Sequence, residues 1–119
     1  MKKCIFCRII RKEVDAEFIY EDNDVVCFLD KNPVSKGHCL IMPKKHCKDI
    51  FEIDSKILEK TAKASKEVAL KLKTDFGAKG INILHASGKV AQQSVFHFHI
   101  HIIPRFPKDS LDMWPKRNN

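Results

Sequence analysis

The chain has 119 residues, a formal net charge of +7 and five cysteines. At roughly 100–200 residues per domain, this length predicts one domain over residues 1–119 and argues against a two-lobed enzyme. With 44% hydrophobic and 31% charged residues, the composition is typical of a folded globular protein. The sequence shows neither a membrane-length apolar run nor the apolar core of a signal peptide, so we expect a cytoplasmic protein without a membrane partner.

The basic residues and the cysteines narrow the class of protein further. Six lysines fall within one candidate helix, and basic and aromatic residues are not interleaved as stacking on nucleic acid requires. We therefore expect small phosphorylated ligands, and not nucleic acid, to use the positive field. An odd number of cysteines argues against a disulfide framework, and Cys27 and Cys39 lie in apolar runs typical of a buried core.

The first half of the chain predicts one short helix followed by three strands. The helix covers residues 4–12, with Ile5 and Ile9 turned toward the core and Phe6 and Ile10 as further candidates for that face. Apolar runs of strand length follow at residues 18–20, 25–29 and 38–42. Turn-forming residues join the first two runs, which predicts a β-hairpin, and Pro43 is expected to end the third.

The second half predicts one long helix and two more strands. From Asp54 to about Lys73, apolar residues recur every three to four positions, with lysines between them. Asp54 is a suitable N-cap, and Gly77 is placed to end the helix. Two further strands are expected at residues 81–85 and 96–103. The prediction is an α+β fold: an antiparallel sheet of about five strands, with one long and one short helix and a C-terminal tail from about residue 107.

Three histidines alternate with apolar residues in the last predicted strand, at positions 97, 99 and 101. Because a strand has a period of two, these histidines share one face, and Phe96, Phe98, Ile100 and Ile102 are expected to bury the other under the long helix. The outer two histidines start about 13 Å apart, so a single metal ion bound by all three is a poor fit. We therefore expect the three histidines to have different roles instead of binding one metal ion together.

The N-terminal segment Cys4-Ile5-Phe6-Cys7 is a Cys-x-x-Cys motif. This spacing supplies half of a tetrahedral zinc site, and His46 and His97 are available as the other two ligands. A redox pair and unligated cysteines are the alternatives. The loop before the histidine row carries Gln93 and Ser94, neutral hydrogen-bonding side chains that suit a phosphate oxygen or an amide.

The run His97-Phe98-His99-Ile100-His101-Ile102-Ile103 resembles the signature of the histidine triad (HIT) family of nucleotide hydrolases and transferases. The resemblance extends over nearly the whole chain: Gly37 to His46 is similar to the family's middle block, and Gln93 to Phe96 leads into the triad. The most similar branch is Hint-like, with zinc-bearing bacterial members. This resemblance implies hydrolysis of a purine nucleoside phosphoramidate or a related adenylylated compound.

The resemblance also implies roles for individual residues. His99 would attack the α-phosphorus to form a covalent nucleotidyl-histidine, His101 would bind phosphate oxygens and protonate the leaving group, and His38 would complete the histidine cluster with His97. The residues expected to bind the nucleotide are Phe6, Ile9 and Phe28 for the base, Asp30 for the ribose, Gln93 and Ser94 for the phosphate, and Trp114, which in the branch's homodimers reaches the partner's site. The implied ligands of a structural zinc are Cys4, Cys7, His46 and His97.

The chain departs from the family pattern in its phosphate loop. His85-Ala86-Ser87-Gly88 stands where an Asn-x-Gly-like stretch is usual, and Gln92 stands where glycine is usual. A side chain at position 92 would crowd the loop or adopt a backbone shape that glycine takes more easily. Two other functions therefore stay open: a nucleotide-binding or protein-interaction module with little turnover, and a metal-dependent hydrolase that uses His99 and His101 as ligands.

Overall fold

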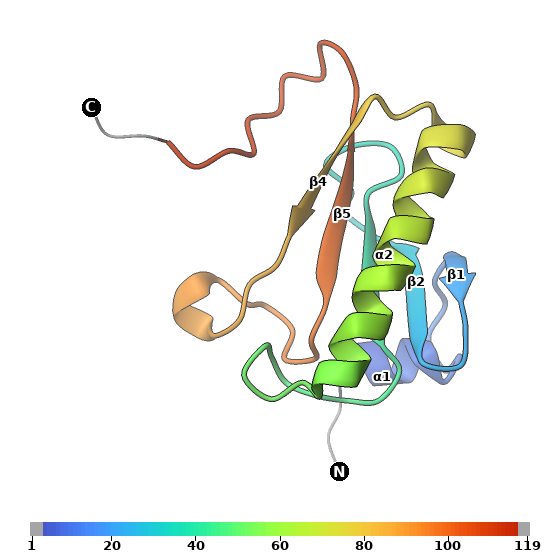
Figure 1. The fold of residues 1–119 in the computed structure, drawn as a ribbon, viewed down its shortest axis with the longest axis vertical. Helices are drawn as coiled ribbons and strands as arrows, with labels where there is room; N and C mark the ends of the chain where they lie inside the picture. The colour runs from blue at the N-terminus through green and yellow to red at the C-terminus, as the bar shows by residue number, and fades with distance from the viewer. Residues whose placement is uncertain (1–3, 117–119) are drawn as a thin grey trace.

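The computed structural model describes residues 4–116, which form two α-helices, five strands and one 3-10 turn (Figure 1). In chain order the elements are α1 (Ile5–Ile10), β1 (Phe18–Glu21), β2 (Val25–Leu29), β3 (Cys39–Pro43), α2 (Ser55–Phe76), β4 (Gly80–Leu84), η1 (Lys89–Ala91) and β5 (Ile100–Arg105). The predicted α+β class, with one long and one short helix, is confirmed. The last residues of the predicted tail, 117–119, lie outside the described residues.

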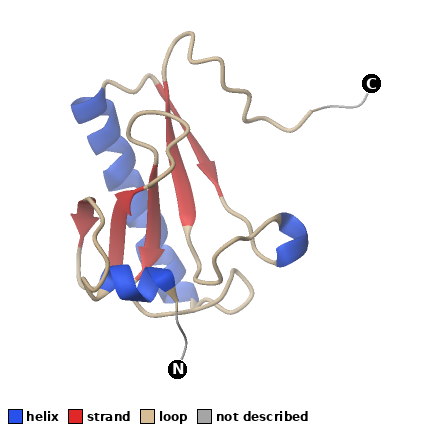
Figure 2. Cartoon of the chain, turned by 180° about the vertical axis from the view of Figure 1, so that it is seen from behind, coloured by secondary structure: helices blue, strands red, loops and turns tan. Residues whose placement is uncertain are grey.

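The strands form one antiparallel sheet in the order β1-β2-β3-β5-β4. The predicted hairpin is β1–β2, and β3 and β5 pair in the middle of the sheet. Helix α2 covers one face of the sheet (Figure 1), and the view from behind shows α1 against the opposite face (Figure 2). The sheet therefore separates two apolar clusters, one under each helix.

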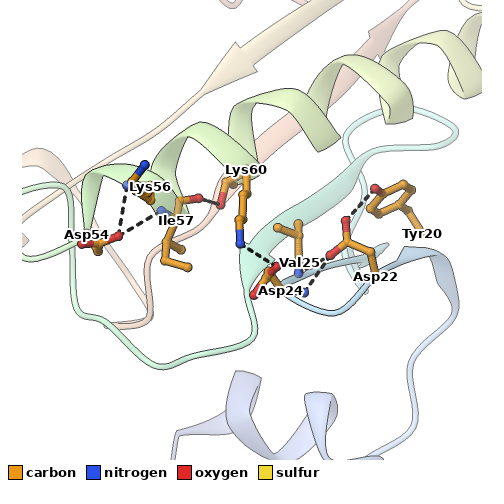
Figure 3. Close-up of polar contacts among 9 residues, drawn as sticks. Tyr20, Asp22, Asp24, Val25, Asp54, Lys56, Ile57 and Lys60 are labelled. Carbon is orange, nitrogen blue, oxygen red and sulfur yellow. Dashed lines mark hydrogen bonds and ion pairs between the residues drawn. The ribbon is translucent and has the colours of Figure 1, made fainter.

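Helix α2 begins and ends where its sequence specifies. The Asp54 carboxylate accepts hydrogen bonds from the backbone N–H groups of Lys56 and Ile57 at 3.0 and 3.3 Å (Figure 3). At the other end Gly77 has a φ of 73°, a left-handed conformation that glycine adopts without steric cost. Val68 and Leu72 are fully buried against Cys27 and Cys39, which are core residues as predicted.

A second set of contacts fixes α2 to the hairpin turn. Lys60 on the helix pairs with Asp24 at 3.0 Å, and Asp22 in the same turn accepts hydrogen bonds from Tyr20 and from the backbone N–H of Val25 (Figure 3). The core cluster on the α1 side consists of Phe6, Ile9, Val26, Phe28, Leu40 and Met42. Four members of this cluster, Phe6, Ile9, Phe28 and Leu40, also line the cavity of the candidate site described below.

Two expectations about the elements are wrong. The predicted strand at residues 96–103 starts only at Ile100, because residues 96–99 bend away from the ladder. Phe96, expected in the core, is therefore 42% exposed, whereas Phe98 and Ile102 are buried as expected. Ile5 is 38% exposed, because the inward face of α1 is formed by Phe6 and Ile9. Pro43 ends β3, as predicted, and is its last residue. As a terminal residue it needs no N–H in the ladder.

Neither helix among residues 4–116 combines the length and the apolar character that crossing a bilayer would require.

Candidate active site

A cavity of about 730 Å³ opens between α1, the ends of β2 and β3, and the start of β5. One end is apolar, with Phe6, Ile9 and Phe28 among its lining residues. The other end is polar and contains Asp30, Ser94, His99 and His101. The structure thus brings together seven of the residues that the sequence analysis predicted for nucleotide binding and catalysis. An apolar end beside convergent polar groups is the usual form of a small-molecule site.

The tautomer of His99 follows from its partner. Its Nδ1 lies 2.8 Å from the carbonyl oxygen of His97, and because a carbonyl only accepts, Nδ1 carries the proton. The lone pair of a neutral ring is then on Nε2. Burial lowers the pKa of His99, so the ring is neutral at pH 7. The Phe6 ring meets His99 edge-on at a centroid distance of 5.0 Å, which restricts how the imidazole can rotate.

His38 and His101 form a directed pair beside His99. The backbone N–H of Val34 donates to His38 Nδ1 at 3.1 Å, so the proton of neutral His38 is on Nε2. His38 Nε2 lies 3.0 Å from His101 Nδ1 and donates to it, which leaves the proton of His101 on its Nε2. Burial lowers the pKa of both rings, that of His101 to about 4 with further repulsion from His99 and His38.

The Asp30 carboxylate lies next to the His38–His101 pair and lines the cavity. One carboxylate oxygen accepts the backbone N–H of Asn32 at 2.8 Å, and the other is 3.4 Å from His38 Nε2. The first bond fixes the carboxylate at the edge of the cavity. The second oxygen can therefore accept a hydrogen bond from a ligand hydroxyl.

The side chains of Gln93 and Trp114 do not line the cavity, so neither is placed to contact a ligand there within its own chain. The Gln93 amide is 5% exposed as a residue and is fully occupied within the protein: it accepts from Gly88 N–H and donates to the carbonyls of Lys48 and Val95. Its neighbour Ser94 does line the cavity. Trp114 is 67% exposed and lies outside the cavity lining of its own chain.

The backbone at Gln92 has the conformation expected of a glycine. Its φ is 75°, in the left-handed region, where a Cβ atom is costly. The side chain is exposed, so it does not crowd the loop. Of the two expectations for this position, the one about backbone shape is confirmed.

A second cluster lies behind the cavity and consists of Cys4, Cys7, His46 and His97, whose ligand atoms are all within 4.8 Å of one another. The nitrogens of His46 and His97 are 3.2 Å apart, Cys7 Sγ is 3.4 Å from His46, and both sulfurs are 3.6 Å from His97 Nδ1. In a tetrahedral zinc site with ordinary bond lengths, these edges are about 3.3 Å for two nitrogens and about 3.6 Å for nitrogen and sulfur. The four residues therefore fit zinc.

The protonation of the cluster agrees with that fit. His97 Nε2 donates to the carbonyl of Pro43 at 2.8 Å, so its Nδ1 lone pair points into the cluster. Burial and the neighbouring Cys4 thiol raise the pKa of Cys7 to about 11, so binding a metal at neutral pH must release that proton. Asp30, His38 and His101 are also close enough together to hold a metal, but the two rings already share a proton along their 3.0 Å hydrogen bond.

His85 is a residue whose place in the site the sequence analysis missed. Its Nδ1 lies 2.8 Å from the carbonyl oxygen of His99. The sequence offered His85 only as a substitute for an asparagine that would touch phosphate, and not as a partner of the triad backbone. A histidine at the end of the predicted strand 81–85 was the available signal.

Comparison with known proteins identifies the family. The sequence pattern of the HIT domain matches residues 11–108, and the chain therefore belongs to the HIT domain family. A HIT-like protein from Borreliella burgdorferi is 43% identical over 100% of this chain and 86% of its own length. An adenylylsulfatase from Arabidopsis thaliana is 38% identical over 91% of this chain and 55% of its own length.

Solved structures agree with this family and its fold. A zinc-bound histidine triad family protein from Mycobacterium smegmatis superposes with a TM-score of 0.89 at 32% identity, covering 98% of this chain and 84% of the other.

Proposed function

We propose that this chain is a hydrolase of purine nucleoside phosphoramidates or related adenylylated compounds, acting through a covalent nucleotidyl-His99 intermediate. The observation that carries the proposal is the Nε2 lone pair of a neutral, oriented His99 at the polar end of the cavity. A neutral imidazole is a nucleophile at pH 7. The name of the Arabidopsis relative, an adenylylsulfatase, supports an adenylylated substrate.

Binding follows from the two ends of the cavity. The purine packs among Phe6, Ile9 and Phe28, because an aromatic base gains most from an apolar slot of this kind. The Asp30 oxygen that does not bind the Asn32 N–H accepts hydrogen bonds from the ribose hydroxyls. This arrangement directs the α-phosphate toward Ser94, His99 and His101.

The first chemical step breaks the bond between the α-phosphorus and the leaving group. His99 Nε2 donates its electron pair to phosphorus, and the P–N or P–O bond electrons move to the leaving nitrogen or oxygen. His101 Nε2–H is placed to protonate that atom, because His38 fixes the tautomer through the 3.0 Å bond to Nδ1. Water then attacks the same phosphorus and gives one proton to His101 Nε2, which restores that N–H group. The electrons of the P–N bond to His99 return to Nε2, so the nucleotide leaves and His99 is again neutral.

Gln93 has an indirect part in this proposal. Its amide holds the loop from Gly88 to Val95 against the carbonyl of Lys48, so that Ser94 is presented to the phosphate. Trp114 is proposed to act in a homodimer, at the partner's site. The edge strand β4, with Ile83 55% exposed, offers a surface for a second copy.

Zinc is proposed as a structural cofactor held by Cys4, Cys7, His46 and His97. When bound, it supplies a cross-link between the N-terminal segment and the triad backbone. The chemistry at phosphorus is left to the chain's own histidines. We further propose that residues 1–119 act as one Hint-like domain in the cytoplasm.

The test is trapping of the intermediate. His99→Ala should abolish hydrolysis of adenosine phosphoramidate. The wild-type protein, quenched at alkaline pH to preserve the P–N bond, should yield an adduct whose mass matches nucleotidylation of the His99 peptide. Leu70→Ala, at an exposed side chain of α2, is the control and should retain both. Turnover like wild type in His99→Ala would contradict the proposal.

The strained backbone at Gln92 favours one alternative function, that of a nucleotide-binding module with little turnover. Tight nucleotide binding without an adduct in the wild-type protein would establish that function. Hydrolysis that requires added metal and leaves no adduct would instead support a metal-dependent hydrolase.

A further inference from the structure

The carbonyl of His99 is held by a side chain at the point where the sheet ends. The last pair of the β4–β5 ladder joins Leu84 to His101, and β5 begins at Ile100. The ladder therefore stops short of the His99 carbonyl. The next residue on the β4 side, His85, supplies the donor with its ring: Nδ1 lies 2.8 Å from that oxygen.

The partners of His85 allow one arrangement of protons in the neutral ring. A carbonyl only accepts, so Nδ1 carries the proton and Nε2 is an acceptor. The hydroxyl of Ser87 contacts Nε2 and donates to it. Ser87 Oγ in turn accepts the backbone N–H of Ile50 at 2.8 Å, which joins the 48–53 loop to the same chain of hydrogen bonds.

Packing holds the ring in the same place. The His85 ring lies against the ring of Phe98 at a centroid distance of 4.5 Å and an interplanar angle of 34°. Phe98 is 1% exposed, so it is a fixed surface. The imidazole is thus held by its face and by both of its nitrogens.

We infer that His85 is a positioning residue for His99, acting through the backbone carbonyl. Two successive triad carbonyls accept an imidazole N–H: that of His97 from the His99 ring, and that of His99 from His85. The first contact sets the direction of the His99 ring, and the second sets the backbone from which this ring projects. The inference rests on the proposed function, because positioning matters only if His99 is the nucleophile.

The hydrogen bond itself can be tested without any substrate. Long-range ¹H–¹⁵N NMR correlation spectra distinguish the two neutral tautomers of a histidine. We expect neutral His85 to be in the Nδ1–H form, and Ser87→Ala to lower the population of that form. An Nε2–H ring in the wild-type protein would overturn the inference whatever the activity.

Two substitutions separate the hydrogen bond from the packing. His85→Phe keeps an aromatic ring against Phe98 but lacks the N–H group. His85→Asn has its amide nitrogen attached at Cγ, where the imidazole has Nδ1, and can donate to the same carbonyl. We expect the single-turnover rate of adduct formation to fall about fivefold in His85→Phe and to return to within about twofold of wild type in His85→Asn, with KM little changed in both.

The outcomes distinguish the inference from the proposed function. Equal rates in wild type and His85→Phe, with the wild-type adduct present, would refute the positioning role alone. A folded His85→Asn as slow as His85→Phe would also refute it. If wild type forms no adduct, the proposed function fails, and the positioning role fails with it, while the tautomer still decides whether the hydrogen bond exists.

Discussion

If the proposed zinc site is correct, loss of one of its two thiolates should make the thermal stability of the protein insensitive to zinc. Cys7 is the informative ligand, because its Sγ lies 3.4 Å from His46 Nδ1 and 3.6 Å from His97 Nδ1. The Cys4 sulfur also accepts the backbone N–H of Cys7 at 3.4 Å, so replacing Cys4 would disturb the start of α1 as well. Cys7→Ser replaces that sulfur with a hydroxyl, a much poorer zinc ligand. The substitution leaves three ligands and an open position.

The expected size of the effect follows from linkage. Zinc that binds only the folded state at a free concentration about 1,000 times its Kd stabilises that state by about 4 kcal/mol. With an unfolding entropy of about 2.1 cal/mol/K per residue, a chain of 119 residues changes by about 0.25 kcal/mol per degree. Zinc should therefore raise the Tm by roughly 16 °C.

Calorimetry with zinc and with excess chelator measures this shift. Wild type should show it, and Cys7→Ser should lose most of it. Cys47→Ser is the matched control, because Cys47 is adjacent to His46 in sequence but is absent from the four-ligand cluster. Cobalt substitution should give strong thiolate charge-transfer absorption in wild type and in the control. A chelator-independent Tm in wild type, or a full zinc shift in Cys7→Ser, would refute the assignment.

Three further predictions concern stability. Gln92→Gly should raise the free energy of unfolding in urea by about 0.5 kcal/mol, because relief of the left-handed strain at a φ of 75° exceeds the entropy that glycine gains in the unfolded chain. Lys89→Gly, in η1, is the control and should lower the free energy of unfolding. A destabilised Gln92→Gly together with a stabilised Lys89→Gly would contradict the reasoning. Leu72→Ala, at a fully buried position of α2, should cost about 2–5 kcal/mol, while Leu70→Ala, 51% exposed on the same helix, should cost less than about 0.5 kcal/mol. The pKa of His101 is lowered from 6.5 to about 4, so the unfolded state takes up its proton first as the pH falls. The contribution of His101 to stability is therefore complete above pH 6.5 and falls by up to about 3 kcal/mol on approaching pH 4. His101→Asn should flatten this part of the pH dependence, and a slope equal to that of wild type would count against it.

Local signals were sufficient to predict the long helix. The spacing of its apolar residues and the cap at Asp54 are properties of adjacent residues, and each acts over one or two turns. The hairpin was equally predictable, since Asp22 forms the turn through its own backbone neighbours. Burial of Cys27 and Cys39 followed from the apolar runs that contain them.

The start of β5 could not be predicted in the same way. A period of two says which side chains share a face, but it does not say where pairing with another strand stops. In residues 96–99, hydrogen bonds to residues distant in sequence replace the strand pairing. The backbone N–H of Phe98 donates to the carbonyl of Cys47 at 2.7 Å, and His97 Nε2 donates to the carbonyl of Pro43. The sequence of residues 96–99 does not predict either hydrogen bond.

The site was predictable by residue type and less so by orientation. The cavity contains the aromatic and acidic residues that the family resemblance implied, from Phe6 to Asp30. The amide of Gln93 instead turns inward to the carbonyl of Lys48, 45 positions away in the sequence. A glutamine in a loop can face a ligand or the protein, and only the fold decides between them.

The shortness of α1 has a consequence for how the cavity behaves over time. A helix of six residues is far below the length that is stable by itself in water, so its order depends on contacts with the sheet. Its two inward side chains, Phe6 and Ile9, are also part of the cavity wall. Detachment of this segment by local unfolding would therefore dismantle the pocket while the rest of the domain stayed folded. A molecule bound against the Phe6 ring and the Ile9 side chain should slow amide hydrogen exchange in α1 more than anywhere in α2.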